Sequence, residues 1–361
     1  MRENYKTANK FYEKNKNFGY EAFKKEAVLP HRYVLVLSNL CNLACSFCFQ
    51  DRKKNPNRMT KDDWLDFLDK IPQNSRVSLT GGEPSLFKGF KEIFIKASNR
   101  NETNIISNGL MLTQEVSELL LSKKNFKVLA ISIDDIGDTT RDLTSKQWNQ
   151  LEKNIHKFLE IRNALEHKAA LDIKTVVLDE NIEDLFEIHK YMVENLKADT
   201  HSLQLLKGAE IQYSDLMYSY DDIHKKYEAH QYKKFDVLIN QLEKIRKYSL
   251  ANYPKAYLHP NIIPLNSSKE ILYKDYEYLN NRNHDKEKFS TCLSPWTSVH
   301  VNVDGNLFPC MAVPMGNVKT QSLEDIIFSN KFKNFKNEIR KCGTINGCNR
   351  CGWLKSDEQS F

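Results

Sequence analysis

Three cysteines stand close together in the segment CNLACSFCFQ, directly after the apolar run YVLVLS. Cys41, Cys45 and Cys48 follow a C-x3-C-x2-C spacing. Thiolates in proteins favour zinc and iron–sulfur clusters, and a closed tetrahedral site takes four ligands. Three thiols therefore leave one position open, and that position can be the place where a substrate or cofactor binds.

Further cysteines lie near the end of the chain. The run SVHVNVDGNLFPC is typical of a hairpin that turns at residues 304–305, and it would bring Cys292 and Cys310 together. A C-x2-C pair, Cys348 and Cys351, would complete a site of four thiolates. A hairpin followed by C-x2-C resembles a zinc ribbon, so these residues alone predict zinc and an iron–sulfur cluster equally.

The chain has eight cysteines, and an even number would also suit a disulfide framework. The first residues, however, are charged throughout and lack the apolar core of a signal peptide. We therefore expect a cytoplasmic protein, in which thiols stay reduced and clustered cysteines bind metal.

Composition limits the class of protein and of partner. The chain has 361 residues, of which 40% are hydrophobic and 11% aromatic, as in a globular protein with a substantial core. The net charge of +6 is spread along the sequence without dense basic blocks, which does not favour nucleic acid as a partner. No apolar run approaches the roughly 20 residues that span a bilayer, so we expect no membrane partner.

The elements that position the first cysteines alternate regularly. Apolar runs predict strands over residues 33–38, 77–80, 104–107, 128–134, 171–178 and 201–206. Amphipathic runs predict helices over residues 60–71, near 88–98, from Thr113, and over 146–165 and 182–196. This alternation predicts an α/β fold with a parallel sheet, either an open barrel or a doubly wound sheet.

Four regions follow from these patterns. We expect a helical N-terminal extension over residues 1–32, an α/β core over 33–208, and a helical insert over 209–290. The cysteine-rich segment over 291–361 is expected to form a small module with a β-hairpin and helices.

The cysteine loop, with Phe47 beside its third cysteine and GGEP at residues 81–84, resembles the radical S-adenosylmethionine (SAM) enzymes. Both segments follow strands, and ligands bind at the carboxyl ends of strands in parallel α/β folds. The resemblance covers about residues 33–206 and 290–353. It implies a partial (β/α)6 barrel in which Cys41, Cys45 and Cys48 hold a [4Fe–4S] cluster that SAM chelates.

The resemblance also implies contacts with SAM. GGEP would hold the amino group of SAM, because glycines permit close backbone approach and a carboxylate accepts hydrogen bonds from an ammonium. Four further contacts are expected from their positions at strand ends, although a helix N-cap and a turn explain them almost equally well. The expected SAM contacts are Phe47, Gly81, Gly82, Glu83, Pro84, Ser107, Asn108, Ser132 and Asp134.

The C-terminal segment is similar to the SPASM and twitch modules that carry auxiliary [4Fe–4S] clusters. A full SPASM module normally supplies more cysteines than this segment has, so the twitch type is the better match. The resemblance implies one auxiliary cluster, with Cys342 as a spare thiol. The implied ligands are Cys292, Cys310, Cys348 and Cys351.

The resemblance implies reductive cleavage of SAM to a 5′-deoxyadenosyl radical that abstracts hydrogen from a substrate. A fully ligated auxiliary cluster can accept an electron, so we expect oxidation of a small polar substrate such as a sugar or aminocyclitol. An external donor such as flavodoxin or ferredoxin would supply electrons. The first alternative is a maturase that crosslinks or epimerises a ribosomal peptide. The second is a zinc-stabilised binding protein without catalytic activity.

The length of chain before the first strand favours a small substrate, because peptide-modifying members often carry an N-terminal recognition domain. No residue is identified as an acid or base for the substrate. Arg141, His201 and Lys207 lie near strand or loop ends, and a surface or structural role is favoured for each.

Overall fold

The computed structural model describes residues 4–25, 28–50, 57–137, 139–208, 218–225, 227–252, 256–260, 289–310, 313–348 and 351–354. Half of the insert expected over residues 209–290 lies outside these described residues. In the part of the insert that is described, a 3₁₀ helix spans Tyr220–His224 and α7 spans Phe235–Ala251, within the helical stretch that the sequence predicts.

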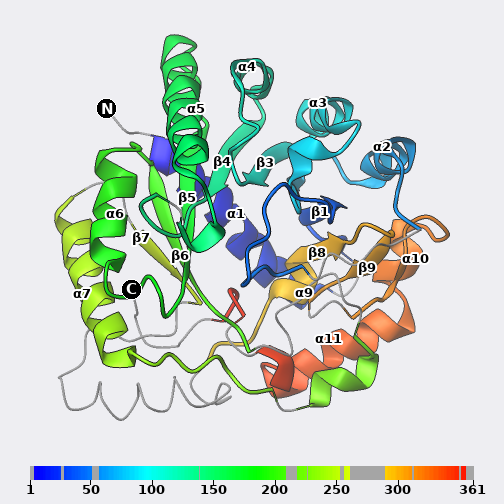
Figure 1. Cartoon of the computed structure of the whole chain (residues 1–361). Helices are drawn as coiled ribbons and strands as arrows, with labels where there is room; N and C mark the ends of the chain where they lie inside the picture. Colours follow the sequence, from blue (N-terminus) through cyan, green and yellow to red (C-terminus); the bar gives the residue numbers. More distant parts are fainter. Residues whose placement is uncertain are drawn as a thin grey trace.

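One ten-stranded sheet forms the centre of the molecule, in the order β10-β9-β8-β1-β2-β3-β4-β5-β6-β7 (Figure 1). All neighbours from β8 to β7 in this order are parallel, and β9 and β10 add an antiparallel edge. The strands are β1 (Arg32–Ser38), β2 (Arg76–Gly81), β3 (Glu102–Ser107), β4 (Phe126–Ser132), β5 (Ala170–Val177), β6 (Thr200–Leu205), β7 (Ala256–His259), β8 (Ser298–Val301), β9 (Asn306–Phe308) and β10 (Gly316–Asn317).

The parallel α/β core confirms the expected fold class, a partial (β/α)6 barrel with a small C-terminal module. The apolar runs predicted as strands become β1 to β6, and β2 is buried along its whole length. Parallel strands are covered on both faces, which is why even the polar residues of β2, such as Ser78 and Thr80, are buried.

The helices that connect the strands cover the outer face of the sheet (Figure 1). A capping box begins α2, where the backbone N–H of Thr60 donates to the Asp63 carboxylate at 2.8 Å. The helices are α1 (Asn4–Lys24), α2 (Lys61–Lys70), α3 (Phe90–Arg100), α4 (Gln114–Leu121), α5 (Ser145–Ala164), α6 (Leu185–Glu194), α7 (Phe235–Ala251), α9 (Ser294–Thr297), α10 (Leu323–Ile327) and α11 (Asn330–Cys342).

The N-terminal helix α1 packs against the sheet. It contacts α9, β4 and β5, and Ala8 of α1 forms a fully buried cluster with Val128 and Ala170. The neighbouring residues Leu129 and Leu171 belong instead to the main core. Successive residues of a strand point to opposite faces of the sheet. The main core lies on the outer face, under the connecting helices, so α1 covers the inner face of the partial barrel.

The C-terminal segment continues the same sheet. β8 pairs in parallel with β1, from Arg32 opposite Ser298 to Leu35 opposite Val301. The predicted hairpin is present as β8 and β9, and Gly305 occupies its turn with φ at +86°. The sequence did not indicate that this hairpin would join the central sheet.

The pattern of apolar residues in the helices bears on membranes. Among the described residues, no helix is both long enough and apolar enough to cross a bilayer.

Candidate functional site

The three-cysteine loop begins where β1 ends. Cys41, Cys45 and Cys48 are all partly exposed, and the loop is held by short local contacts. The backbone N–H of Cys48 donates to the carbonyl of Cys45 at 3.2 Å, and the N–H of Leu43 donates to the Cys41 sulfur at 3.4 Å. The loop therefore turns back on itself and keeps its thiols accessible.

Two glycines allow the end of β2 to lie directly against this loop. The N–H of Gly82 donates to the carbonyl of Ser38 at 2.6 Å, and the N–H of Glu83 donates to that of Leu40 at 2.8 Å. A Cβ atom on Gly81 would lie 2.3 Å from the Ser38 oxygen, and one on Gly82 would lie 2.2 Å from the Leu40 oxygen. The close approach predicted for these glycines is thus made to the cysteine loop itself.

Glu83 lies at the end of β2, as the sequence predicts. Its side chain is fully buried, and its carboxylate accepts hydrogen bonds from Ser85, from the Ser107 hydroxyl at 3.0 Å and from the Asn108 N–H at 2.8 Å. Burial raises the pKa of Glu83, and these hydrogen bonds oppose the rise. The carboxylate joins the ends of β2 and β3, and its expected contact with the ammonium of SAM stays a prediction.

Asn108 connects the end of β3 to the cysteine loop. Its side-chain amide donates to Asn42 Oδ1 at 2.7 Å and lies 3.7 Å from the Cys41 sulfur. Its own Oδ1 accepts from the N–H of Leu110 at 3.0 Å, which fixes the orientation of the amide. Asn108 is therefore placed to donate a hydrogen bond toward the first thiol.

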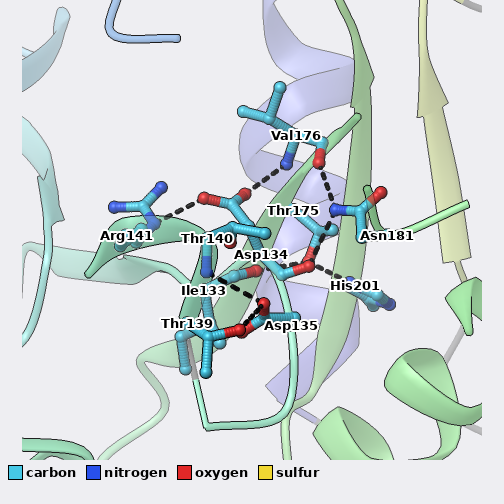
Figure 2. Close-up of polar contacts among 10 residues, drawn as sticks. All are labelled: Ile133, Asp134, Asp135, Thr139, Thr140, Arg141, Thr175, Val176, Asn181 and His201. Carbon is cyan, nitrogen blue, oxygen red and sulfur yellow. Dashed lines mark hydrogen bonds and ion pairs between the residues drawn. The ribbon is translucent and has the colours of Figure 1, made fainter. Parts of the chain in front are cut away.

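Figure 2 shows the polar contacts beyond the end of β4. Asp134 is fully buried and forms an ion pair with Arg141, and it accepts from the Val176 N–H at 2.5 Å. The Asn181 side chain donates to the Asp134 carbonyl at 2.8 Å. Burial raises the pKa of Asp134, while the Arg141 charge opposes that rise.

Arg141 extends from this network toward the cysteine loop. Its guanidinium carbon lies 5.7 Å from the centroid of the Phe47 ring. Burial raises the pKa of the Cys45 thiol, and the charge of Arg141 is the largest effect in the opposite direction. The sequence favoured a surface or structural role for Arg141, but the structure places it on the wall of the cavity as well as in a buried ion pair.

A cavity of about 460 Å³ lies at the carboxyl ends of the strands. Both groups of cysteines contribute to its wall, the first through Cys41, Cys45 and Cys48 and the second through Cys310 and Cys351. The expected SAM contacts on this wall are Phe47, Gly81, Gly82, Ser107, Asn108 and Ser132. Glu83, Pro84 and Asp134 do not line the cavity; each is buried among the groups that hold the wall in place.

Of the other two residues considered for a chemical role, one lies away from the cavity and one lines it. His201 is fully buried away from the cavity, where its ring contacts Thr175 and His189, each at 2.9 Å. Lys207 lines the cavity just after β6. The structural role favoured for His201 agrees with its position, whereas Lys207 is a wall residue that the sequence did not distinguish.

The tail cysteines form a second group. Cys310 follows β9, Cys292 precedes α9, and Cys348 and Cys351 lie in a turn closed by the Cys351 N–H donating to the Cys348 carbonyl at 3.1 Å. Burial raises the pKa of Cys310 and of Cys348, and the other thiols of this group raise both further. The four sulfurs are therefore close enough to interact electrostatically.

Cys342 stands apart from this group. It is the last residue of α11, and its sulfur lies 3.7 Å from the Glu338 carboxylate one turn earlier. It does not contribute to the pKa shifts of Cys310 or Cys348. Its place as a spare thiol is consistent with the geometry and stays a prediction.

The structure describes all eight cysteines, and none of them forms a disulfide. One group of three thiols and one group of four, both reaching the same cavity, match the donor sets of two thiolate-bound centres. By number, three thiols suit an open centre with a free ligand position and four suit a closed one. Among the described residues, however, no three or more Cys, His, Asp or Glu side chains are grouped so that they could hold a single metal ion.

Several wall residues were missed by the sequence analysis. Arg32, at the start of β1, donates to the Ser298 hydroxyl at 2.9 Å and lies 5.3 Å from the centroid of the Trp353 ring. Gly352 packs against Gln204 on β6, where a Cβ atom would be 3.2 Å from the Gln204 amide oxygen. The only feature of the sequence that could have indicated these contacts is Trp353, the aromatic residue two positions after the C-x2-C pair.

Two family models match the chain. Residues 35–192 match the Radical SAM superfamily, and residues 292–352 match SPASM, an iron–sulfur cluster-binding domain. The sporulation killing factor maturation protein SkfB of Bacillus subtilis is 25% identical over 331 residues, which cover 89% of this chain and 70% of SkfB.

Solved structures share the fold. SuiB of Streptococcus suis bound to the precursor peptide SuiA has a TM-score of 0.61 at 19% identity, covering 90% of this chain and 71% of SuiB. anSMEcpe with bound S-adenosylmethionine and the Cp18Cys peptide has a TM-score of 0.55 at 15% identity, covering 85% and 82% of the two chains.

Proposed function

The chain is a radical SAM enzyme with a C-terminal SPASM domain, and from that premise we propose that it is a maturase that modifies a peptide. Its cofactors are SAM, a SAM-binding [4Fe–4S] cluster and an auxiliary [4Fe–4S] cluster. When bound, these groups supply the reductive cleavage of SAM, hydrogen abstraction by the 5′-deoxyadenosyl radical, and an acceptor for one electron. A zinc-stabilised protein without catalysis is not supported, because both domain models match.

The observation that carries the proposal is the single cavity between the two groups of thiols. We assign Cys41, Cys45 and Cys48 to the open centre and the four tail cysteines Cys292, Cys310, Cys348 and Cys351 to the closed one. A cavity of about 460 Å³ is within the usual range for a bound ligand, and it can take one amino-acid side chain beside a cofactor. A substrate residue in this cavity would lie between both centres.

Relatives support a peptide over the small polar substrate that the sequence analysis put first. The name of SkfB describes a maturation protein, and the SuiB and anSMEcpe structures contain peptides. The peptide-modifying alternative is therefore the better supported reading. Crosslinking and epimerisation both begin with loss of a hydrogen atom from the peptide.

The residues of this chain have distinct tasks in the proposed reaction. Gly81 and Gly82 hold the cysteine loop against β2, and Asn108 donates toward the first thiol. Arg141, fixed by Asp134, presents a positive charge to the cavity beside Phe47. The SPASM segment contributes Cys310, Cys351 and Trp353 to the wall of the cavity, where it would limit the access of water to the reacting residue.

The test uses anaerobically reconstituted protein, SAM, dithionite and synthetic peptides encoded by short genes beside this one. We expect a peptide to change in mass by loss of hydrogen for a crosslink, or to gain deuterium from heavy water for an epimerisation. Each product should be accompanied by 5′-deoxyadenosine. The variant Cys342→Ala should retain this activity, and Cys41→Ala should lose it.

A different outcome would contradict the proposal of a peptide substrate. If 5′-deoxyadenosine forms with every peptide but no peptide is altered, while a sugar alcohol or aminocyclitol is converted to its ketone, the enzyme acts on small polar substrates. Tandem mass spectrometry of the peptides and of the small molecules separates these outcomes.

A further inference from the structure

The described part of the insert is attached to the core at the ends of β5 and β6. The paired residues of these two strands end at Val177 opposite Leu205. Just beyond that pair, the Tyr232 hydroxyl accepts from the backbone N–H of Leu206 at 2.8 Å and donates to the Val177 carbonyl at 3.0 Å. One side chain of the insert therefore continues the connection between the two strands past their last paired residues.

Tyr232 is fixed by its surroundings. Its side chain is buried, and its ring packs edge-on against His230 and alongside Phe235, the first residue of α7. The next residue, Lys233, donates its backbone N–H to the Asp179 carboxylate at 2.8 Å, in the loop that follows β5. Because both the ring and the neighbouring backbone are held, the hydroxyl stays between the two strand ends.

The strand ends that Tyr232 joins belong to the wall of the cavity. The SAM contacts expected on this wall lie on or after β1 to β4, which leaves the ends of β5 and β6 for the substrate. We call the wall residues at these two ends the substrate wall. They are Val176, Gln204, Leu205, Leu206 and Lys207.

The insert also contacts the C-terminal segment. The His224 carbonyl, at the end of the 3₁₀ helix Tyr220–His224, accepts from the Asn346 side-chain amide at 2.6 Å. The Tyr220 ring packs edge-on against Phe335 of α11, with ring centroids 6.4 Å apart. The insert therefore joins the substrate wall to the segment that carries the tail cysteines.

We propose that Tyr232 is a positioning residue for the substrate, because its hydroxyl fixes the substrate wall. A backbone N–H or carbonyl at a strand end that loses its partner allows the chain to open locally. A wall that moves holds the reacting residue in more than one orientation, whereas hydrogen abstraction needs one. The inference rests on the proposed function for the presence of a peptide in this cavity. It gives a task to the insert, which neither family model covers.

The experiment removes a single oxygen atom from the insert. Tyr232→Phe loses both hydrogen bonds to the strand ends. Tyr227→Phe is the matched control, because Tyr227 is also buried and its hydroxyl donates to the Asp222 carbonyl at 2.9 Å, within the insert itself. Both variants are made in the full-length chain and reconstituted with iron and sulfide beside the wild type.

Hydrogen exchange measured by mass spectrometry tests the position of the wall. The Leu206 amide should exchange faster in Tyr232→Phe than in the wild type, because it loses its acceptor. In Tyr227→Phe it should exchange at the wild-type rate. Equal exchange of this amide in all three proteins would overturn the inference.

Steady-state kinetics test the effect on the substrate. With a peptide that the wild type modifies, Tyr232→Phe should lower kcat/KM for the peptide about fivefold, the scale set by one lost hydrogen bond. The KM for SAM should not change. The same loss in Tyr227→Phe, or an equal effect on SAM, would mean a general loss of stability and would contradict the positioning role. If the wild type modifies no peptide, the proposed function fails, and the exchange of the Leu206 amide still decides this inference.

Discussion

Glu83 links the ends of two strands behind the wall of the cavity, and its expected contact with SAM stays a prediction. Its carboxylate accepts from Ser85, Ser107 and Asn108, so that it joins the ends of β2 and β3. Two of these partners, Ser107 and Asn108, line the cavity, whereas Glu83 does not. The acidic residue of GGEP thus shapes the wall through the residues that it holds.

The first prediction concerns the cysteines themselves. Reconstituted wild-type protein should hold about eight iron atoms, and Cys45→Ala should hold about four, because each [4Fe–4S] cluster contributes four. SAM cleavage should be lost in Cys45→Ala, while Cys342→Ala should match the wild type in both measurements. Four iron atoms with one zinc in the wild type would contradict the assignment of the tail cysteines.

The second prediction concerns the ion pair of Asp134 and Arg141. Both side chains are buried, so Arg141→Met leaves a carboxylate without its cation and should lower the free energy of unfolding by about 3 kcal/mol. The double variant Asp134→Asn with Arg141→Met should lose less, because no buried charge remains. Urea unfolding measures both values, and equal losses in the two proteins would argue against the ion pair.

The features that could be predicted from the sequence are those that depend on the spacing of residues close together in the chain. The grouping of Cys41, Cys45 and Cys48 in one loop could be predicted because they are near neighbours in the chain, and their role as cluster ligands stays a prediction. The place of Arg141 and of Lys207 could not, since it depends on how loops after β4 and β6 fold over the cavity. The hydrogen bonds of the Glu83 carboxylate to Ser107 and Asn108 could not be predicted either, because they depend on the pairing of β2 with β3.

At the scale of elements, the contact between the end of β2 and the cysteine loop is the tightest near the site. Gly82→Ala would place a Cβ atom 2.2 Å from the Leu40 carbonyl oxygen, and a backbone atom in a packed turn has little room to move. We expect the variant to lose the iron of the open centre, about half of the total, and to retain the rest.

Gly137→Ala is the control for this prediction. Gly137 has φ at +91°, but a Cβ atom there would meet nothing closer than the Thr139 methyl carbon at 3.8 Å. It should therefore keep its full iron content in spite of some backbone strain. Equal iron loss in both variants would show that the close contact at Gly82 is not what holds the cysteine loop.

A pH effect is expected from the histidines between α6 and β6. His189 and His201 are fully buried, and their Nδ1 atoms lie 2.9 Å apart. Burial lowers the pKa of His189 to about 4 and that of His201 well below its usual value. Between pH 6.5 and about 4 the unfolded chain binds protons that the native protein does not, so the free energy of unfolding falls as pH falls.

Each such histidine contributes at most about 1.4 kcal/mol per pH unit in this window. His189→Gln should reduce the slope of unfolding free energy against pH, measured by urea titration at a series of pH values. His156→Gln, at an exposed position on α5, should leave the slope unchanged. An unchanged slope in His189→Gln would show that this ring is protonated in the native protein.

The regular elements of the core could be predicted from the sequence to within a few residues. Six apolar runs became β1 to β6, and Thr60 and Thr113 begin helices where they were expected to. β7 and β8 were missed as members of the sheet because each is short and separated from its neighbour by a long stretch of chain. Pairing between strands that are far apart in the chain produces no local sequence pattern from which it could be predicted.

At the scale of the whole molecule, the C-terminal segment is part of the core. Removing residues 291–361 would expose the edge of β1 and uncover residues packed against Val299 and Val301, which are fully buried. We expect the shortened chain to aggregate on gel filtration, because an exposed apolar edge strand pairs with other chains.

The control for this truncation is the full-length chain with Cys292→Ala and Cys348→Ala. It lacks two thiols of the tail but keeps β8 and β9, and it should elute as the wild type does. If the shortened chain elutes normally, or if the cysteine variant aggregates as well, the strands are not what stabilises this part of the molecule.

The parallel pairing of β8 with β1 has a consequence for the rate of electron movement. β1 leads into the three-cysteine loop and β8 begins the hairpin that leads to Cys310, so one hydrogen-bonded backbone connects both groups of thiols. Tunnelling slows steeply as distance grows, and a rigid sheet keeps that distance constant during turnover. Long and short substrates would then meet the same spacing between the two redox centres, and the rate of any electron transfer would depend on how the substrate itself is positioned between them.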